Sequence, residues 1–148
     1  MLLRDNHTAI SVGDMEKSLA FYRDLLGMKV RMDTGPVPRP HSPLMDKLFG
    51  LSGISFRIAH LETDDAYVLE LLQWHAPTPE PSSAQMKPND VGFHSQCFYD
   101  TDFDGLCERL KAAGVRFVSE PVDLGRGPTV FCSDPDGNWV EIRPHTRR

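Results

Sequence analysis

The stretch HTAISVGDMEKSLAFYRDLLGMKV, residues 7–30, has a counterpart later in the chain, HSQCFYDTDFDGLCERLKAAGVRF, residues 94–117. Each stretch begins with a histidine, and a glycine follows at the same offset of 20 residues (27 − 7 and 114 − 94). In both, an alternating strand pattern leads into apolar residues at helical spacing, and the glycine ends the helical pattern as a C-cap. The chain is therefore predicted to contain one module twice.

The first module is predicted to have the order βαβββ. A strand at residues 6–12 precedes Asp14, the N-cap of a helix that ends at Gly27, and a strand follows at about 28–33. The proline- and glycine-containing stretch at residues 35–53 cannot continue a sheet, because proline lacks the ladder donor, and it holds one short helical turn. Strands at 54–61 and 66–74 complete the module.

The second module repeats this order after a proline-rich linker at residues 75–90. We expect a strand at 91–99, a helix at about 102–113 with Thr101 and Asp104 at capping-box spacing, and strands near 115–119, 128–133 and 138–143. At 148 residues the chain has the size of a single domain. The fold class predicted is α+β, one domain over residues 1–148 built from modules at about 1–75 and 90–148.

The composition excludes two kinds of partner. A net charge of −5 argues against nucleic acid, and no stretch approaches the length of apolar sequence that spans a bilayer. The first ten residues lack the layout of a secretory signal, so we expect a cytoplasmic protein. Cys97, Cys107 and Cys132 are an odd number without CxxC spacing and are interpreted as small core residues.

One glutamate stands among apolar residues near the end of each module. Glu70 lies in AYVLELLQW and Glu141 in GNWVEIRPH. A buried carboxylate must pair with a base, be protonated or bind a metal, and otherwise the side chain faces solvent. On one isolated strand the solvent-facing alternative is favoured, but recurrence beside His7 and His94 favours a shared site. A curling sheet would gather these two imidazoles and two carboxylates around one divalent ion, with zinc, nickel, cobalt, iron and manganese all possible.

Strand alternation suggests further residues around this site. Ala9 and Ser11 share the face of His7, Gln96 that of His94, and Trp139 and Arg143 that of Glu141. Arg143 is a candidate for holding a substrate carboxylate or phosphate, with a surface arginine at a strand end as the equal alternative. Gln96 and Trp139 are further candidates for substrate contact. The remaining histidines do not recur between modules and are expected to be exposed or hydrogen-bonded: His41, His60, His75 and His145.

The segments FYRDLLGMKV, VLELLQW and DPDGNWVEI, with His7 before TAISVGD and His94 after VGF, resemble the vicinal oxygen chelate superfamily. That superfamily includes glyoxalase I, bleomycin-resistance proteins and extradiol dioxygenases. The resemblance covers nearly the whole chain and implies a curled eight-stranded cup around a metal, the glyoxalase-like fold. By position, His7, Glu70, His94 and Glu141 match the metal ligands of bacterial glyoxalase I.

Other members depart from this ligand pattern. Methylmalonyl-CoA epimerases show glutamine at the position of Glu70 and a His-His pair where this chain has Phe93-His94. The antibiotic-binding members lose the ligands, and two-domain extradiol dioxygenases are longer and use three ligands. Retention of all four ligands favours a metalloenzyme.

The function implied is a metal-dependent lyase or isomerase of glyoxalase I type. Its metal chelates two adjacent oxygens of a small-molecule substrate and stabilises the enediolate formed when a neighbouring carbon loses its proton, with Glu70 or Glu141 as base. The alternatives are an Fe(II)-dependent dioxygenase and a non-catalytic antibiotic-binding protein. Four questions stay open: the substrate, the metal, which glutamate is the base, and whether the cup closes within one chain or across the homodimer that the family analogy favours.

Overall fold

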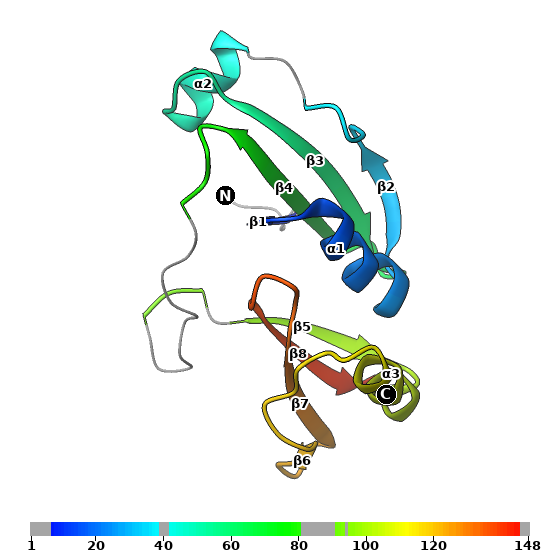
Figure 1. Cartoon of the computed structure of the whole chain (residues 1–148). Coiled ribbons are helices and arrows are strands. Elements are labelled where there is room, and N and C mark those ends of the chain that lie inside the picture. Colours follow the sequence, from blue (N-terminus) through cyan, green and yellow to red (C-terminus); the bar gives the residue numbers. More distant parts are fainter. Residues whose placement is uncertain (1–6, 39–41, 81–90, 94, 146–148) are drawn as a thin grey trace, which may run out of the picture. The chain divides into compact units, whose positions relative to one another are not determined.

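The computed structural model describes residues 7–38, 42–80, 91–93 and 95–145 (Figure 1). The chain divides into two compact units, Met1–Pro81 and Ser82–Arg148, and each is described by itself. In the described residues each unit combines one four-stranded mixed sheet with helical structure, so the predicted α+β class and its eight strands are confirmed. The single domain and the closure of both sheets into one cup stay predictions.

The first unit follows the predicted order. Its sheet has the strand order β1-β4-β3-β2, in which β1 runs parallel to β4 and the other neighbours are antiparallel. The elements are β1 Thr8–Ser11, α1 Met15–Leu19, the π-helical segment η1 Ala20–Leu25, β2 Lys29–Asp33, α2 Pro43–Phe49, β3 Ser55–Glu62 and β4 Val68–Ala76.

Local sequence explains how the first helix begins and ends. Asp14 is extended, and its Oδ1 accepts hydrogen bonds from the backbone N–H groups of Glu16 at 3.0 Å and Lys17 at 3.2 Å, as the N-cap prediction requires. The last turn widens, because Leu26 N donates to the carbonyl five residues earlier. Gly27 follows with φ +78°, a conformation that a residue with a Cβ adopts only with strain.

One face of the first sheet forms the core of the unit, and the other carries Glu70. Leu69, Leu71 and Leu61 alternate onto one face with none of their surface exposed, and α1, with buried Met15 and Leu19, packs against β4 (Figure 1). This face is the core of the unit. The intervening residues of β4 point to the other face, and Glu70 is among them.

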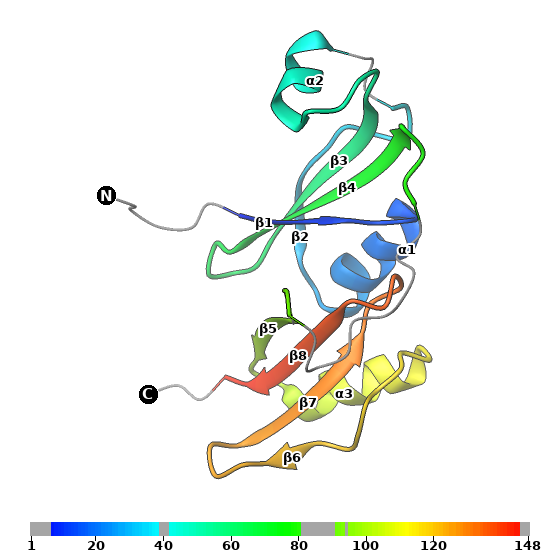
Figure 2. The same cartoon turned by 90° about the vertical axis from the view of Figure 1, so that its left-hand side faces the viewer.

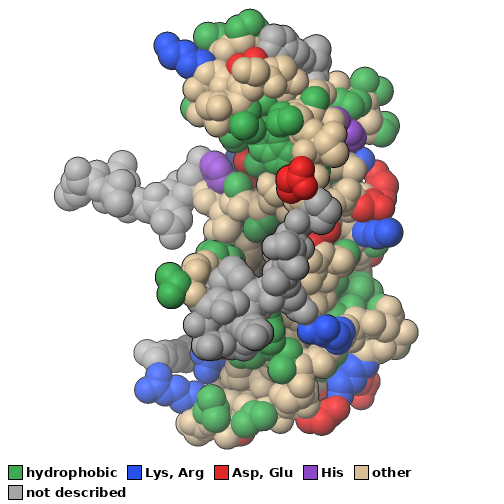
Figure 3. All heavy atoms as spheres, turned by 60° about the vertical axis from the view of Figure 1, so that its left-hand side comes forward, with side chains coloured by type: hydrophobic (Ala, Val, Ile, Leu, Met, Phe, Trp, Pro, Cys, Tyr) green, Lys and Arg blue, Asp and Glu red, His purple; other side chains and the backbone are tan. Residues whose placement is uncertain are grey.

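The proline-containing stretch forms a larger structure than the single helical turn expected. α2 has seven residues, and Gly50 ends it in the left-handed conformation. Met45 on α2 packs on a buried cluster of Ile54, Phe56 and Leu72 at the end of the sheet. Figure 3 shows exposed hydrophobic side chains at the top of the view, and the exposed large apolar residues of this segment are Val37, Leu44, Leu48, Phe49 and Leu51.

The second unit repeats the topology of the first, but its edge strand β6 is shorter and pairs with β7 at only two positions. Its sheet order is β5-β8-β7-β6, with β5 parallel to β8 and α3 packed against β5 and β8 (Figure 2). The elements are β5 Ser95–Asp100, α3 Phe103–Ala112, β6 Val122–Asp123, β7 Pro128–Ser133 and β8 Trp139–Pro144.

Three sequence predictions for this unit are wrong in detail. Residues 115–119 do not form a strand: Phe117 makes one isolated bridge to Cys132, and the edge strand lies at Val122–Asp123 instead. The N-cap of α3 is Asp102, whose carboxylate accepts from Gly105 N, so the cap is not Thr101. Cys97 is exposed, while Cys107 and Cys132 are buried as expected.

None of the helices in the described ranges has the length and apolar character that a bilayer crossing requires.

Candidate metal centre

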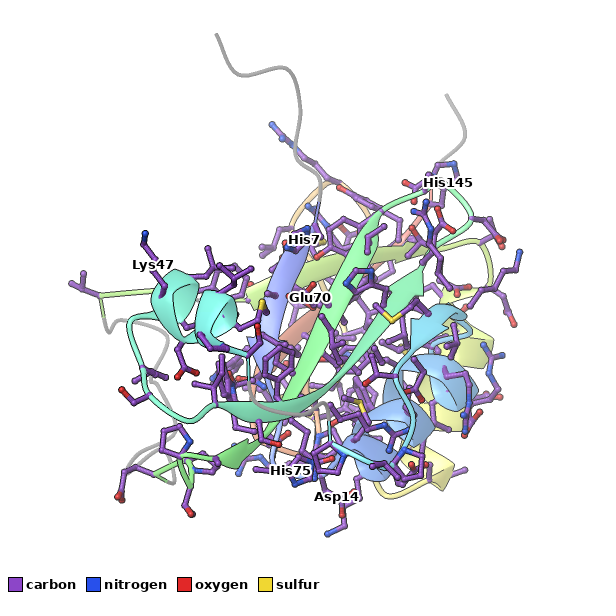
Figure 4. All side chains as sticks on the ribbon, turned by 90° about the horizontal axis from the view of Figure 1, so that it is seen from above. His7, Asp14, Lys47, Glu70, His75 and His145 are labelled. Carbon is purple, nitrogen blue, oxygen red and sulfur yellow. The ribbon has the colours of Figure 1, made fainter. Side chains whose placement is uncertain are left out.

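The first half of the predicted ligand set, His7 and Glu70, comes together in the first unit. His7 precedes β1, and Glu70 lies on β4, where Ala9 is its register partner. His7 Nε2 lies 4.0 Å from Glu70 Oε2, and Figure 4 shows the two side chains next to each other. The Glu70 side chain is 14% exposed and that of His7 38%, so the carboxylate is largely shielded and the imidazole stays reachable.

A third side chain completes this cluster. His60 on β3 is the antiparallel register partner of Glu70, and its Nε2 lies 2.6 Å from Glu70 Oε2. The His60 and His7 rings are stacked, with centroids 6.2 Å apart. His60 is thus hydrogen-bonded, as expected for a histidine that does not recur, but its partner is not evident from the sequence alone. The register of the β3–β4 hairpin places His60 opposite Glu70, but the sequence gives that register only if the position of the turn is known to within one residue.

Toward α2, this face becomes mostly apolar and aromatic. Trp74 Nε1 donates to Ser11 Oγ at 3.0 Å, which places Ser11 on the Glu70 face as strand parity predicted. The Trp74 ring contacts Phe56 and Phe49, with centroids 5.4 and 5.1 Å away. Glu70 and the two histidines therefore lie beside an apolar surface on which an organic substrate could rest.

The second unit presents Glu141 on β8 with a charged neighbour. Arg143 Nε lies 3.7 Å from Glu141 Oε1, so the two side chains share a face as predicted. Cys97 on β5 is the register partner of Glu141. Its sulfur is partly shielded from water, and this desolvation, followed by the negative charge of Glu141, raises the pKa of the Cys97 thiol to about 11. The thiol is therefore protonated at neutral pH and is a poor nucleophile there.

The two other predicted substrate residues lie on different faces. Trp139 shares the Glu141 face, and its ring meets that of Phe131 edge-on with centroids 5.9 Å apart. Gln96 instead pairs in register with the fully buried Val140, on the opposite face. Its amide atoms have no hydrogen-bond partner among the described residues. The substrate role of Gln96 stays a prediction.

His94 lies outside the described residues, so its predicted ligation stays a prediction. Within the described ranges, no group of three or more His, Cys, Asp and Glu side chains is arranged to hold a metal ion. The donors of His7 and Glu70 are close to the spacing that an ion requires: at metal–ligand distances of about 2.1 Å, two tetrahedral neighbours are about 3.4 Å apart, and these two atoms lie 4.0 Å apart.

Comparison with known proteins gives the family. Residues 4–142 match the model of the Glyoxalase/Bleomycin resistance protein/Dioxygenase superfamily. The chain belongs to this superfamily. A lactoylglutathione lyase of Pseudomonas aeruginosa is 32% identical over 93% of this chain and 80% of its own length. The mitochondrial methylmalonyl-CoA epimerase of Bos taurus is 28% identical over 94% of this chain and 73% of its own.

The superfamily assignment agrees with the fold. A glyoxalase family protein from Bacillus cereus superposes with a TM-score of 0.87 at 19% identity, covering 97% of this chain and 95% of that one. The imidazole of His7 and the carboxylate of Glu70 are donors of the kind that borderline divalent ions prefer. The recognition made from the sequence segments is confirmed.

Proposed function

We propose that the protein is a divalent-metal-dependent lyase or isomerase of glyoxalase I type. One observation carries the proposal: His7 Nε2, just before β1, and Glu70 Oε2 on β4 lie 4.0 Å apart in a chain that is 32% identical to a lactoylglutathione lyase. We further propose that His94 and Glu141 complete the ligand set, within one chain or across a homodimer.

The residues of the chain divide the work between binding and proton transfer. His7, Glu70, His94 and Glu141 would hold the ion. When bound, it supplies positive charge that stabilises the enediolate oxygens of a substrate with two adjacent oxygen atoms. Glu70 or Glu141 takes the proton from carbon and returns it to the neighbouring carbon. Glu70 is suited to this role because its carboxylate is largely shielded from water beside an apolar surface.

The substrate class proposed is a hemithioacetal, the adduct of a 2-oxoaldehyde and a thiol. It carries the two adjacent oxygens that chelation requires, and several relatives of this chain are named lactoylglutathione lyase. The similarity to a methylmalonyl-CoA epimerase favours a CoA thioester as the second candidate. In both reactions a proton leaves a carbon next to a carbonyl group; the lyase returns it to the neighbouring carbon, and the epimerase returns it to the same carbon. We also propose a cytoplasmic homodimer as the working form.

The test begins with metal content. The protein is purified without chelator and analysed for metal beside His7→Ala, Glu70→Ala, His94→Ala and Glu141→Ala, with His75→Ala as control. His75 is exposed and lies at the other end of β4 from Glu70 (Figure 4). The proposal is supported if the wild type and the control bind a stoichiometric amount of metal and the ligand variants lose it. Isomerisation of hemithioacetals is then followed with each metal restored.

The same experiment discriminates the alternatives. Iron as the only activating metal, with oxygen consumption during turnover, would assign a dioxygenase. Wild-type protein that binds no divalent metal but binds apolar antibiotics would assign a sequestering protein.

A further inference from the structure

We propose that His60 is a positioning residue for Glu70, holding its carboxylate in place for metal binding and proton transfer. The inference rests on the proposed function and adds to the four predicted ligands a fifth side chain that acts through one of them. His60 Nε2 lies 2.6 Å from Glu70 Oε2.

The contact has the features of a built hydrogen bond. His60 and Glu70 are directly opposite each other in the β3–β4 hairpin, so the backbone ladder already places their side chains together. Both are mostly buried, with 29% of the His60 side chain and 14% of the Glu70 side chain exposed. Because an ionised carboxylate only accepts hydrogen bonds, His60 Nε2 must be the donor. A hydrogen bond to a charged acceptor in such a place is stronger than one in water.

The position of His60 separates it from the predicted ligands. His60 Nε2 is hydrogen-bonded to Oε2 of Glu70. His7 Nε2 lies 4.0 Å from the same oxygen and makes no hydrogen bond to it. A metal ion could use His7 and Glu70 while His60 keeps its bond to the carboxylate. Residues that orient ligands in this way change metal affinity without entering the coordination shell.

The experiment compares three variants of the full-length protein. His60→Phe keeps a flat ring of similar size and removes the donor, His60→Gln keeps an N–H donor, and His75→Gln removes an exposed histidine of the same sheet. Binding of Co²⁺ is measured by titration together with its visible absorption spectrum. Thermal unfolding of each metal-free variant reports whether it is folded.

The expected result is a loss of affinity with an unchanged coordination shell. His60→Phe should weaken Co²⁺ binding by about 10- to 100-fold, with the wild-type spectrum at saturation, and His60→Gln should recover part of that loss. His75→Gln should bind as the wild type does. Equal affinity in His60→Phe and wild type would overturn the inference, and a changed spectrum at saturation would make His60 a ligand instead.

A metal-independent measurement separates this inference from the proposed function. The unfolding free energies of His60→Phe, Glu70→Gln and the double variant form a thermodynamic cycle in metal-free protein. Non-additive effects confirm that the two side chains are coupled, and additive effects overturn the inference whatever the metal does. A wild-type protein that binds no metal would refute the proposed function and the metal-binding role of His60, while the cycle would still decide the pairing itself.

Discussion

Arg57 Nη2 lies 2.6 Å from Asp33 Oδ2, and Arg57 Nε donates to Asp33 Oδ1 at 3.0 Å, so two parallel hydrogen bonds join β3 to β2. The remaining nitrogen, Nη1, donates to Glu16 Oε1 on α1 at 2.6 Å. The Arg57 side chain is only 7% exposed. One buried cation therefore connects two strands of the first sheet with the helix that covers it.

Loss of Asp33 should destabilise the first unit. Asp33→Asn leaves the Arg57 charge buried without its two-bond partner, and we expect the free energy of unfolding to fall by about 2 kcal/mol. Urea denaturation followed by circular dichroism measures the change. The control is Asp64→Asn, which breaks a fully exposed ion pair with Lys29 and should have no measurable effect. Equal stability of both variants would show that the Arg57 pair contributes nothing net.

Acid should remove the contribution of this pair. The hydrogen bonds from Arg57 hold the pKa of Asp33 below its usual 3.8. The folded protein therefore binds this proton less readily than the unfolded chain does. The stabilisation is fully present above pH 3.8 and disappears as the pH falls through the lower folded value. Urea denaturation of wild type and Asp33→Asn should give a difference at pH 6 that shrinks below pH 4, and a constant difference would contradict the linkage.

The aromatic cluster under α2 should be a second stabilising contact. Phe56 is 4% exposed and meets Phe49 on α2 and Trp74 on β4. Phe56→Ala should cost about 3 kcal/mol, because the cavity would lie between the sheet and a short helix. Leu44→Ala, on the exposed side of α2, should leave the urea midpoint unchanged. Hydrogen exchange would show whether α2 loosens first.

Arg143 should affect substrate binding more than turnover. If its guanidinium holds an anionic group of the substrate beside Glu141, loss of that charged hydrogen bond costs about 1.5 kcal/mol, roughly tenfold in KM. Arg143→Gln should therefore raise KM with little change in kcat, and Arg143→Lys should recover part of the loss. A fall in kcat at constant KM would show instead that Arg143 acts through its 3.7 Å contact with Glu141.

Metal removal should lower stability as well as activity. An ion that binds only the folded state adds about 2.7 kcal/mol to the free energy of unfolding at one hundred times its dissociation constant. Protein stripped with chelator should unfold at a lower temperature and recover when a divalent ion is added. His7→Ala should show no such recovery, whereas the exposed-site variant His75→Ala should recover fully. Recovery in both variants would place the ion elsewhere.

Much of the fold follows from local patterns in the chain. The repeat predicted both βαβββ units, because the two-residue period of a strand and the spacing of apolar residues in a helix are patterns among neighbouring residues. Asp14 and Gly27 mark the two ends of the first helix by their own backbone preferences. The strand expected at 115–119 failed because an edge strand depends on the partner it meets, here β7, and not on its own composition.

For the candidate site, too, some residues could be predicted from the sequence and others only from the tertiary structure. Residue type and periodicity were enough to single out His7, Glu70, His94 and Glu141, because a histidine and a carboxylate recurring at matched points of two modules is visible in one dimension. Only the tertiary structure could show that His60 stands 2.6 Å from Glu70. That contact depends on the register of β3 against β4, and register is decided by pairing across a turn, which no single strand encodes.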